Sequence, residues 1–422
     1  MKEDVLQFIW KMKRLPNQPI YTTAGDPIRI IDFGEINYDQ GPDFLNGRVL
    51  IRNVEFVGSI EIHRNSSDWI KHNHSSSKQY DNVILHVVYN HDSEIVNSYK
   101  RPLPTIELKE LIDPYLLLNY QRIMDSKIDV PCQSMIKRID KLYWRSFQDR
   151  LFAERLDRKA KLISIDLLRS GNNWEETFYR LLFKYVAMGV NSGMFFELAK
   201  SIPLSCINKL GKDILAVKAV LYGQANLLED VTNEYEIKLR EEYEYQKIKL
   251  RLKKNYFQLK YSRMRPANFP TVRILQLSSL LVERPRLFQK IVQSETKENV
   301  INILTVDPNI HSVNTQYVGI KNTDKTGPFG LYTINSLILN LVVPSMYAYG
   351  KYIGDENLLR NATRIMEATD CENNKVIRMW KGLSVPCSNG YDSQSLLELY
   401  NNYCSHKKCL NCAIGFKTIT GQ

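Results

Sequence analysis

The chain has 422 residues, 44% of them hydrophobic and 24% charged, which is the composition of a folded protein and excludes long disordered segments. Its formal net charge of +11 favours a polyanionic partner such as nucleic acid, although such a charge also keeps ordinary proteins dispersed. The charged N-terminal segment lacks a secretory signal, and Asn340 and Pro344 interrupt the most apolar run. We therefore expect a cytoplasmic protein without a membrane partner, and the oligomeric state stays open.

The residues before about position 111 are expected to form a small sheet with one helix in front of it. Apolar residues at helical spacing predict the helix, and alternating or β-branched runs predict the strands. The expected elements, in chain order, are a helix at 5–12, a strand at 27–35, two strands at 47–63 joined near Arg52 and Asn53, a polar connection at 64–81 that could hold a short helix, a buried strand at 82–90 and a short strand at 103–110.

From about position 142 onward the sequence has helical periodicity throughout, and strand signals are scarce. One long helix is expected at 234–261, and a linker is expected near 112–138. We predict an α+β protein with an α/β domain at residues 1–125, followed by a large all-helical region at 126–422 that carries a C-terminal cysteine motif. No fixed sequence period is present, so a repeat family is not established.

Two carboxylates and an imidazole are expected to meet at the predicted hairpin. Glu61 and His63 share one face of a strand because side chains alternate between faces. Asp43 begins the preceding strand, so an antiparallel turn near Arg52 would bring it beside them. Two such carboxylates suit Mg²⁺ or Mn²⁺, which would polarise a phosphate and activate a water, while His63 would orient that water. The plainer interpretation is a polar strand end with a capped turn.

This pattern resembles the restriction-endonuclease-like superfamily, the PD-(D/E)XK nucleases, through Pro42-Asp43 and the segment from Glu61 to His63. The resemblance implies a core of helix, three strands, helix and strand, and a metal held by Asp43 and Glu61. Glu3 would match a Glu that the family often carries on its first helix. His63 stands where the family has Lys, and an imidazole is shorter and can bind metal itself. That departure supports an inactive descendant.

The whole chain also resembles a bacterial family catalogued as domain of unknown function 2851. The resemblance rests on the segments "GPDF", "GSIEIH", "SSDW", "HNH", "YDNVILHVV", "RPANFP" and "CLNCAIG". It covers nearly the full length and implies no activity.

Histidines are concentrated near the hairpin. Five of the seven, His63, His72, His74, His86 and His91, fall close together in the sequence. His86 interrupts an apolar strand, where an unpaired imidazole would be costly, so it is either a hydrogen-bonded core residue or part of a site. We take Glu3, His72, His74 and His86 as candidate helpers of Asp43, Glu61 and His63. The letters "HNH" coincide with the name of another nuclease class and indicate nothing by themselves.

Three cysteines near the C-terminus, Cys404, Cys409 and Cys412, have the spacing C-x4-C-x2-C. This spacing fits three ligands of an iron–sulfur cluster whose fourth ligand comes from elsewhere. Cys387 is the nearest candidate for the fourth, with Cys371 and Cys132 behind it, and His406 offers a zinc alternative. Some nucleases of the restriction-like superfamily carry such a cluster on C-terminal cysteines. Reduced structural thiols remain the other interpretation.

A basic segment at 247–265 carries interleaved aromatic residues. Lys253, Lys254, Lys260 and Arg263 are candidates for nucleic-acid contacts, since cationic and aromatic side chains together suit phosphates and bases. The plainer interpretation is the solvated face of a long helix, whose upstream glutamates offset the charge.

Three hypotheses follow. The first is a metal-dependent nuclease that hydrolyses phosphodiester bonds. The second is a catalytically inactive nuclease-like module on a helical scaffold that binds nucleic acid or a protein partner. The third is a metal-dependent hydrolase of another substrate, which the many histidines favour and the basic charge disfavours.

Overall fold

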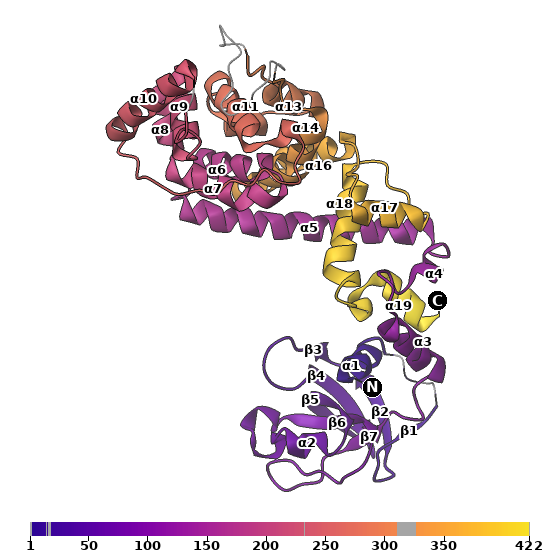
Figure 1. Ribbon diagram of the computed structural model, residues 1–422. Coiled ribbons are helices and arrows are strands. Elements are labelled where there is room, and N and C mark those ends of the chain that lie inside the picture. The colour runs from indigo at the N-terminus through magenta and orange to yellow at the C-terminus, as the bar shows by residue number, and fades with distance from the viewer. Residues whose placement is uncertain (1, 14, 16–17, 232, 310–325, 422) are drawn as a thin grey trace. The chain divides into compact units, whose positions relative to one another are not determined.

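The structure is a computed structural model that describes residues 2–13, 15, 18–231, 233–309 and 326–421. The protein is mixed α/β and mostly helical, with 56% helix and a sheet near the N-terminus. It divides into two compact units (Figure 1). The sheet unit comprises Met1–Ile139 and Asn401–Gln422, and the helical unit comprises Asp140–Tyr400.

The sheet unit is built on one mixed sheet of seven strands. Its strand order is β1-β2-β4-β5-β6-β7, with β3 paired to β4. The strands are β1 (Ile20–Tyr21), β2 (Pro27–Asp32), β3 (Glu35–Ile36), β4 (Phe44–Ile51), β5 (Val54–Asn65), β6 (Val83–Asn90) and β7 (Thr105–Glu107). Strands β2, β4 and β5 are antiparallel neighbours, whereas β6 runs parallel to both β5 and β7. The strands predicted before position 111 are therefore present, and the very short β1 was not foreseen.

The turn between β4 and β5 lies at the predicted position. Arg52 and Asn53 both have positive φ, at 49° and 66°. Two central residues of this kind characterise the tight hairpin turn whose twist matches that of the flanking strands. The turn pairs Ile51 with Val54 and so sets the register of the whole hairpin.

Helix α1 (Glu3–Lys11) packs its apolar face on the sheet. Val5, Leu6 and Ile9 are fully buried, and together with strand residues such as Ile60 they form the core of this unit. The polar connection after β5 holds helix α2 (Asp68–Lys71) and two single turns, η1 (His74–Ser76) and η2 (Lys78–Tyr80). Strand β6 has neighbours on both sides and is mostly buried, as its β-branched run predicted.

The segment expected to be a linker, 112–138, instead belongs to the sheet unit. It contains helices α3 (Pro114–Asp125) and α4 (Gln133–Ile136). The C-terminal residues were expected in the helical region, and they also belong to the sheet unit, as η7 (Cys409–Asn411) and α19 (Ala413–Thr420). Helix α19 packs on α3, and Phe416 meets Phe8 of α1 edge to face at 5.8 Å. Apolar contacts between distant segments decide this arrangement, and sequence periodicity does not report them.

The helical unit has a core made by helices that follow one another in the sequence. Its helices are α5 (Lys141–Arg169), α6 (Trp174–Val186), η3 (Gly189–Asn191), α7 (Ser192–Ser201), α8 (Leu204–Leu210), α9 (Ile214–Gln224), α10 (Glu234–Lys249), η4 (Pro266–Asn268), α11 (Pro270–Glu283), α12 (Leu287–Val292), α13 (Lys297–Leu304), α14 (Leu331–Leu337), η5 (Ile338–Val342), α15 (Val343–Ile353), α16 (Glu356–Ala368), α17 (Lys375–Gly382) and α18 (Gly390–Leu399), with η6 (Tyr400–Cys404) directly after it. Buried Arg155 of α5 joins α18 through Gln394 and Glu398.

The prediction of one long helix at 234–261 is wrong beyond Lys249. Arg251 has a φ of 55°, which ends the helix, and the chain continues as an extended segment. Side-chain amides hold that segment: Gln224 donates to the Lys253 carbonyl at 2.7 Å, and Asn191 bonds both backbone groups of Lys260 at 2.8 and 2.9 Å. Leu252 packs on the core beneath. These buried amides satisfy the backbone groups that a helix would otherwise satisfy.

A long apolar stretch of the helical unit is a core helix. Leu331–Ile353 is long and apolar enough to cross a membrane by length and composition alone, but 67% of its most apolar window is buried inside the protein. This agrees with its interpretation as a buried helix.

Candidate metal centre

A one-residue bulge brings Asp43 opposite Glu61. Starting at the turn, Ile51 pairs with Val54, and the same register continues to the pair Gly47 and Gly58. The register then shifts by one residue, so that Phe44 pairs with Ile60. Asn46, inside the bulge, has a φ of 59°. Without the shift, Asp43 would continue opposite Ile62, on the wrong face of the sheet. Such bulges redirect side chains and are common near functional sites.

The two carboxylates are locked together by reciprocal hydrogen bonds. The Asp43 backbone N–H donates to Glu61 Oε2 at 3.0 Å, and the Ile62 N–H donates to Asp43 Oδ2 at 3.0 Å. Gln7 of α1 donates its amide to Asp43 Oδ1 at 2.8 Å. Glu61 is 5% exposed. Its second oxygen, Oε1, is left facing the histidines.

Burial makes both carboxylates hard to ionise without a cation. Burial and the charge of Glu61 raise the pKa of Asp43 to about 7. Burial and the charge of Glu3 raise the pKa of Glu61 to about 8. Two acids held this closely in a buried place favour a bound cation, because a cation would compensate both charges.

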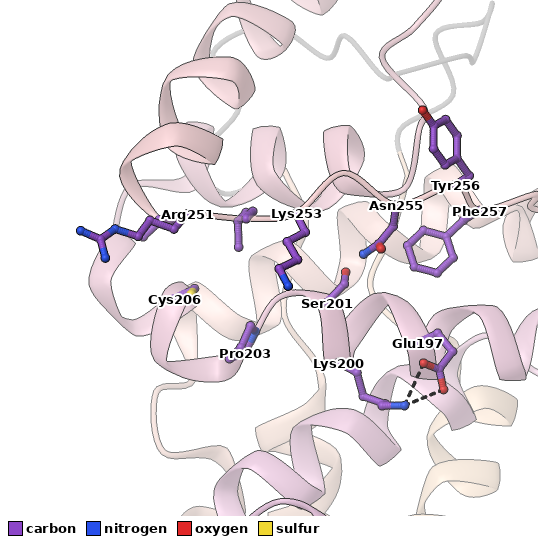
Figure 2. A pocket seen from close by; sticks show the side chains of 12 residues that line it. Glu197, Lys200, Ser201, Pro203, Cys206, Arg251, Lys253, Asn255, Tyr256 and Phe257 are labelled. Atoms are coloured by element: carbon purple, nitrogen blue, oxygen red, sulfur yellow. Dashed lines mark hydrogen bonds and ion pairs between the residues drawn. The ribbon is translucent and has the colours of Figure 1, made fainter.

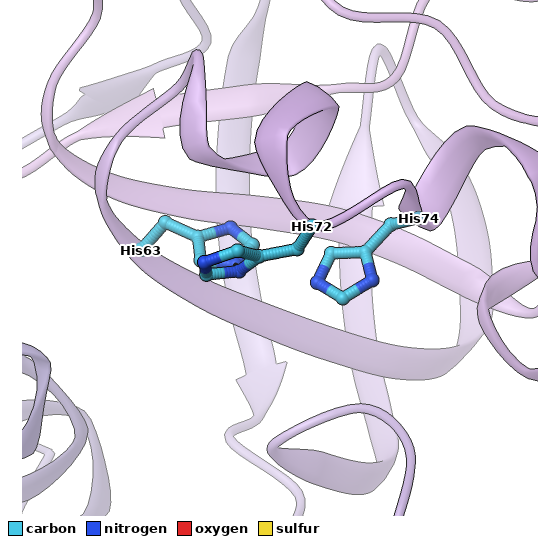
Figure 3. Close-up of side chains that lie close together, drawn as sticks. All are labelled: His63, His72 and His74. Carbon is cyan, nitrogen blue, oxygen red and sulfur yellow. The ribbon is translucent and has the colours of Figure 1, made fainter.

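Three imidazoles cluster beside Glu61, and two of them approach its Oε1 atom. The ring nitrogens of His63, His72 and His74 that could bind a metal all lie within 4.8 Å of one another (Figure 3). His63 Nε2 and His74 Nε2 each lie 3.4 Å from Glu61 Oε1, and His63 Nε2 lies 3.2 Å from His72 Nδ1. Ligand atoms about 2.1 Å from a tetrahedral ion are roughly 3.4 Å apart. The spacing therefore fits a shared ion better than ordinary hydrogen bonds.

The imidazoles of His63 and His74 are held neutral, which is the form that binds metal. Burial, followed by the neighbouring His74 and His72, lowers the pKa of His63 to about 3. Burial also lowers the pKa of His74, against the opposing charges of Asp43 and Glu3. A neutral imidazole keeps a lone pair on one ring nitrogen.

His86 supports His63 from behind. Its Nε2 lies 2.8 Å from His63 Nδ1, and the His86 side chain is fully buried. Burial lowers the pKa of His86 well below the usual value, so the ring is neutral. If His63 presents Nε2 to an ion, its Nδ1–H donates to His86. Such outer partners fix the tautomer and orientation of a metal-binding histidine.

The loop that carries His72 and His74 is fixed by packing and by hydrogen bonds. Asn73, between the two histidines, has a left-handed backbone with φ 58°. Trp69 is fully buried against His74 and His86, and Tyr80 stacks on His74 with ring centroids 3.7 Å apart. The imidazoles are thus positioned before any ligand binds.

The donor set combines oxygen and nitrogen atoms. Carboxylates alone suit Mg²⁺, but a site with several imidazoles suits Mn²⁺, Zn²⁺ or Fe²⁺ better. The residues present therefore fit a divalent transition metal such as Mn²⁺, Fe²⁺ or Zn²⁺, all of which bind mixed sets of imidazoles and carboxylates.

The structure brings together all seven sequence candidates for this site. Glu3 lies near enough for its charge to raise the pKa of both Asp43 and Glu61. Sequence reasoning missed Gln7 and Tyr80. The helical spacing that predicts α1 gives no sign that Gln7 points at Asp43. Tyr80 follows the "HNH" segment and could have been suspected only from its proximity in sequence. His91 pairs with Glu94 at 3.3 Å and is among the groups that lower the pKa of His86.

The four basic candidates lie in the helical unit, on the extended segment after α10. Lys253 lines a cavity of about 630 Å³ together with Lys200, which is paired with Glu197 (Figure 2). Lys254 pairs with Glu229 at 3.6 Å. The segment exposes all four candidate side chains, Lys253, Lys254, Lys260 and Arg263.

The candidate cysteines are divided between the two units. Cys387 lies in the helical unit, where burial and neighbouring Cys371 raise its pKa to about 12. Cys404, Cys409 and Cys412 lie in the sheet unit, as does Cys132, whose charge contributes to the raised pKa of Cys404. Cys132 is thus the sequence candidate for a fourth ligand that shares a unit with these three. His406 is exposed.

Comparison with family models places most of the chain in one family. The model of a family described as "Protein of unknown function (DUF2851)" matches residues 3–375. No curated protein and no solved structure matches the chain.

Proposed function

The chain belongs to the DUF2851 family, whose description states no function, and we propose from its own residues that it is a metal-dependent hydrolase of phosphodiester bonds in nucleic acid. One observation carries the proposal: Glu61 is locked to Asp43 through one carboxylate oxygen and presents the other to His63 and His74, which cluster with His72. No ordinary structural role requires so many metal-capable groups around one buried oxygen.

In this proposal each residue of the site has a distinct role. Glu61, His63 and His74 would hold the cation, with Asp43 beside it, and His72 would stay unligated on the exposed side. A bound divalent cation would polarise the phosphate and lower the pKa of an attacking water. Asp43 and Gln7 keep the Glu61 carboxylate in place by the hydrogen bonds described above.

His72 is the best-placed group for proton transfer. It is exposed, whereas His63 and His86 are buried and have strongly lowered pKa values that keep them unprotonated. An exposed imidazole beside the site can accept a proton from a water or return one to a leaving group. His63, in contrast, is positioned to hold the cation and not to carry charge.

The topology around the site supports the nuclease resemblance. Helix α1 precedes an antiparallel set of strands, α2 follows, and β6 then pairs parallel with β5. This is the order that the PD-(D/E)XK resemblance implies, with Asp43 and Glu61 on neighbouring strands. The restriction-endonuclease-like fold is part of the proposal.

Nucleic acid as the substrate is supported by charge. The net charge of +11 attracts polyanions, and the exposed basic segment with Lys253, Lys254, Lys260 and Arg263 offers phosphate contacts beside Tyr256. Tyr256 is 80% exposed, and Lys254 lies over its ring at 5.2 Å. An exposed aromatic ring among cations suits stacking of a base.

A second candidate function rests on His63. In the resembled family a lysine occupies this place, and here the imidazole is turned toward Glu61 and His86. The same centre could hold a metal only to shape a module that binds nucleic acid or a protein partner. This candidate predicts metal binding without hydrolysis.

Cleavage assays separate the two. We expect the full-length protein to cut single- or double-stranded DNA or RNA in Mn²⁺, more slowly in Mg²⁺, and not at all with chelator, because the donor set favours Mn²⁺. Products are resolved on denaturing gels with 5′-labelled substrates. Binding of the same nucleic acids without cleavage in any of the metals would overturn the hydrolase and leave the binding module.

A further inference from the structure

Four buried thiols gather in the sheet unit, away from the carboxylate site. Cys132 lies just before α4, and Cys404, Cys409 and Cys412 come from the C-terminal segment. Their exposed fractions are 6%, 8%, 6% and 6%. Cys132 is separated from the other three by the entire helical unit in sequence, so their convergence is a property of the fold.

Contacts between the C-terminal segment and helix α3 produce this convergence. Lys407 donates to the backbone carbonyl of Met124 at the end of α3, at 2.5 Å. Asn119 of α3 donates to the carbonyl of Ile419 in α19, at 3.4 Å. The C-terminal segment therefore contacts α3 through both Lys407 and α19, and the connection from α3 to α4 supplies Cys132.

The four sulfurs influence one another electrostatically. Burial, followed by Cys412 and Cys409, raises the pKa of Cys132 to about 12. Burial, followed by Cys412, Cys132 and Cys409, raises the pKa of Cys404. Thiols with raised pKa values are poor nucleophiles, so a catalytic thiol is not indicated. Thiolate sulfur is the ligand that zinc and iron–sulfur clusters take in proteins.

The separation of the sulfurs distinguishes a zinc site from an iron–sulfur cluster. Among the described residues, the ligand atoms of His63, His72 and His74 all lie within 4.8 Å of one another. No three cysteine sulfurs among the described residues approach one another that closely. A tetrahedral zinc ion with bonds of about 2.3 Å holds its sulfurs roughly 3.8 Å apart. A four-iron cluster binds each cysteine at a separate iron and holds the sulfurs farther apart.

We propose that Cys132, Cys404, Cys409 and Cys412 bind an iron–sulfur cluster that fastens the C-terminal segment to α3. Three ligands from a short segment and a fourth from a distant one is an arrangement that such clusters use. The cluster would take the place of a larger apolar core between α3, α4 and α19, all of which are short helices. The inference is independent of the hydrolytic site.

The test is the metal content of full-length protein purified without oxygen. We expect about four iron and about four sulfide per chain, with a broad visible absorption that dithionite bleaches. Cys132→Ser should lose most of the iron, whereas Cys387→Ser, a buried cysteine of the helical unit, should keep it. Zinc in place of iron, or no bound metal, would overturn the proposal.

A second variant keeps the ligand assignment testable if Cys132→Ser does not fold. The double variant Cys371→Ser with Cys387→Ser removes both cysteines of the helical unit that the sequence offered as fourth ligand. If Cys132 is the fourth ligand, this double variant should keep its full iron content. Loss of iron from the double variant would overturn the assignment to Cys132. Neither readout depends on cleavage activity, so failure here is distinguishable from failure of the proposed function.

Discussion

Glu61→Gln is expected to lower kcat/KM for nucleic-acid cleavage by about 10³-fold or more and to abolish tight Mn²⁺ binding. The substitution keeps the size of the side chain, and its carbonyl oxygen can still accept the Asp43 N–H. It removes the negative charge at the position that faces His63 and His74. Cleavage rates and Mn²⁺ titration calorimetry on the same preparation measure both effects.

The matched control is Glu55→Gln on the same strand. Glu55 pairs with Arg48 at the exposed end of the hairpin and lies away from the histidines. It should change neither activity nor metal affinity by more than about twofold, because exposed ion pairs contribute little. Equal loss in both variants would mean that the hairpin, and not the Glu61 carboxylate, is what matters. Full activity in Glu61→Gln would remove this residue from the proposed centre.

Mn²⁺ affinity is expected to rise by roughly 10²- to 10³-fold between pH 6 and pH 8 and to level off above that range. The pKa values of about 7 for Asp43 and about 8 for Glu61 set this window. Below it both carboxylates are protonated, and a cation must displace their protons. His63 and His74 have lowered pKa values, so they stay neutral across the window and add no competing proton.

Calorimetry at several pH values, in buffers of different ionisation enthalpy, measures both the affinity and the protons released. At pH 6 binding should release close to two protons, and above pH 8 fewer than one. In Glu61→Gln, the Mn²⁺ affinity that remains should depend less on pH than the affinity of the wild-type protein. An affinity that is independent of pH in the wild-type protein would mean that these carboxylates are not the groups a cation displaces.

The sheet was largely predictable because its strands carry strong local signals. The turn at Arg52 and Asn53 and the alternation in β5 placed Glu61 and His63 on one face. The one-residue bulge at Asn46 was not predictable, and it is what moves Asp43 to that same face. The expected meeting of Asp43 and Glu61 was thus right, although the simple hairpin register that suggested it would have failed.

The features that sequence reasoning missed depend on contacts between distant segments. Gln7 points at Asp43 only because α1 packs on the sheet. Cys132, which the sequence offered only behind Cys387, shares a unit with the C-terminal cysteines because α19 packs on α3. The extended segment after Lys249 depends on buried amides of Gln224 and Asn191, which no periodicity reveals.

The clustering of the histidines was visible in the sequence, but its geometry was not. The sequence offered His72 and His74 only as helpers of Asp43, Glu61 and His63. The structure directs His63 and His74 at one oxygen of Glu61 and leaves Asp43 bonded to Gln7 and Ile62. Of the two ions expected from the sequence, Mg²⁺ and Mn²⁺, this arrangement favours Mn²⁺, which accepts nitrogen ligands more readily.

The most direct test of the central claim is anomalous diffraction from crystals grown with Mn²⁺ at pH 8 or above. The account predicts one strong peak about 2.2 Å from Glu61 Oε1 and from Nε2 of His63 and His74. Crystals at the same Mn²⁺ concentration with no peak there, or with a peak that excludes Glu61, would contradict it.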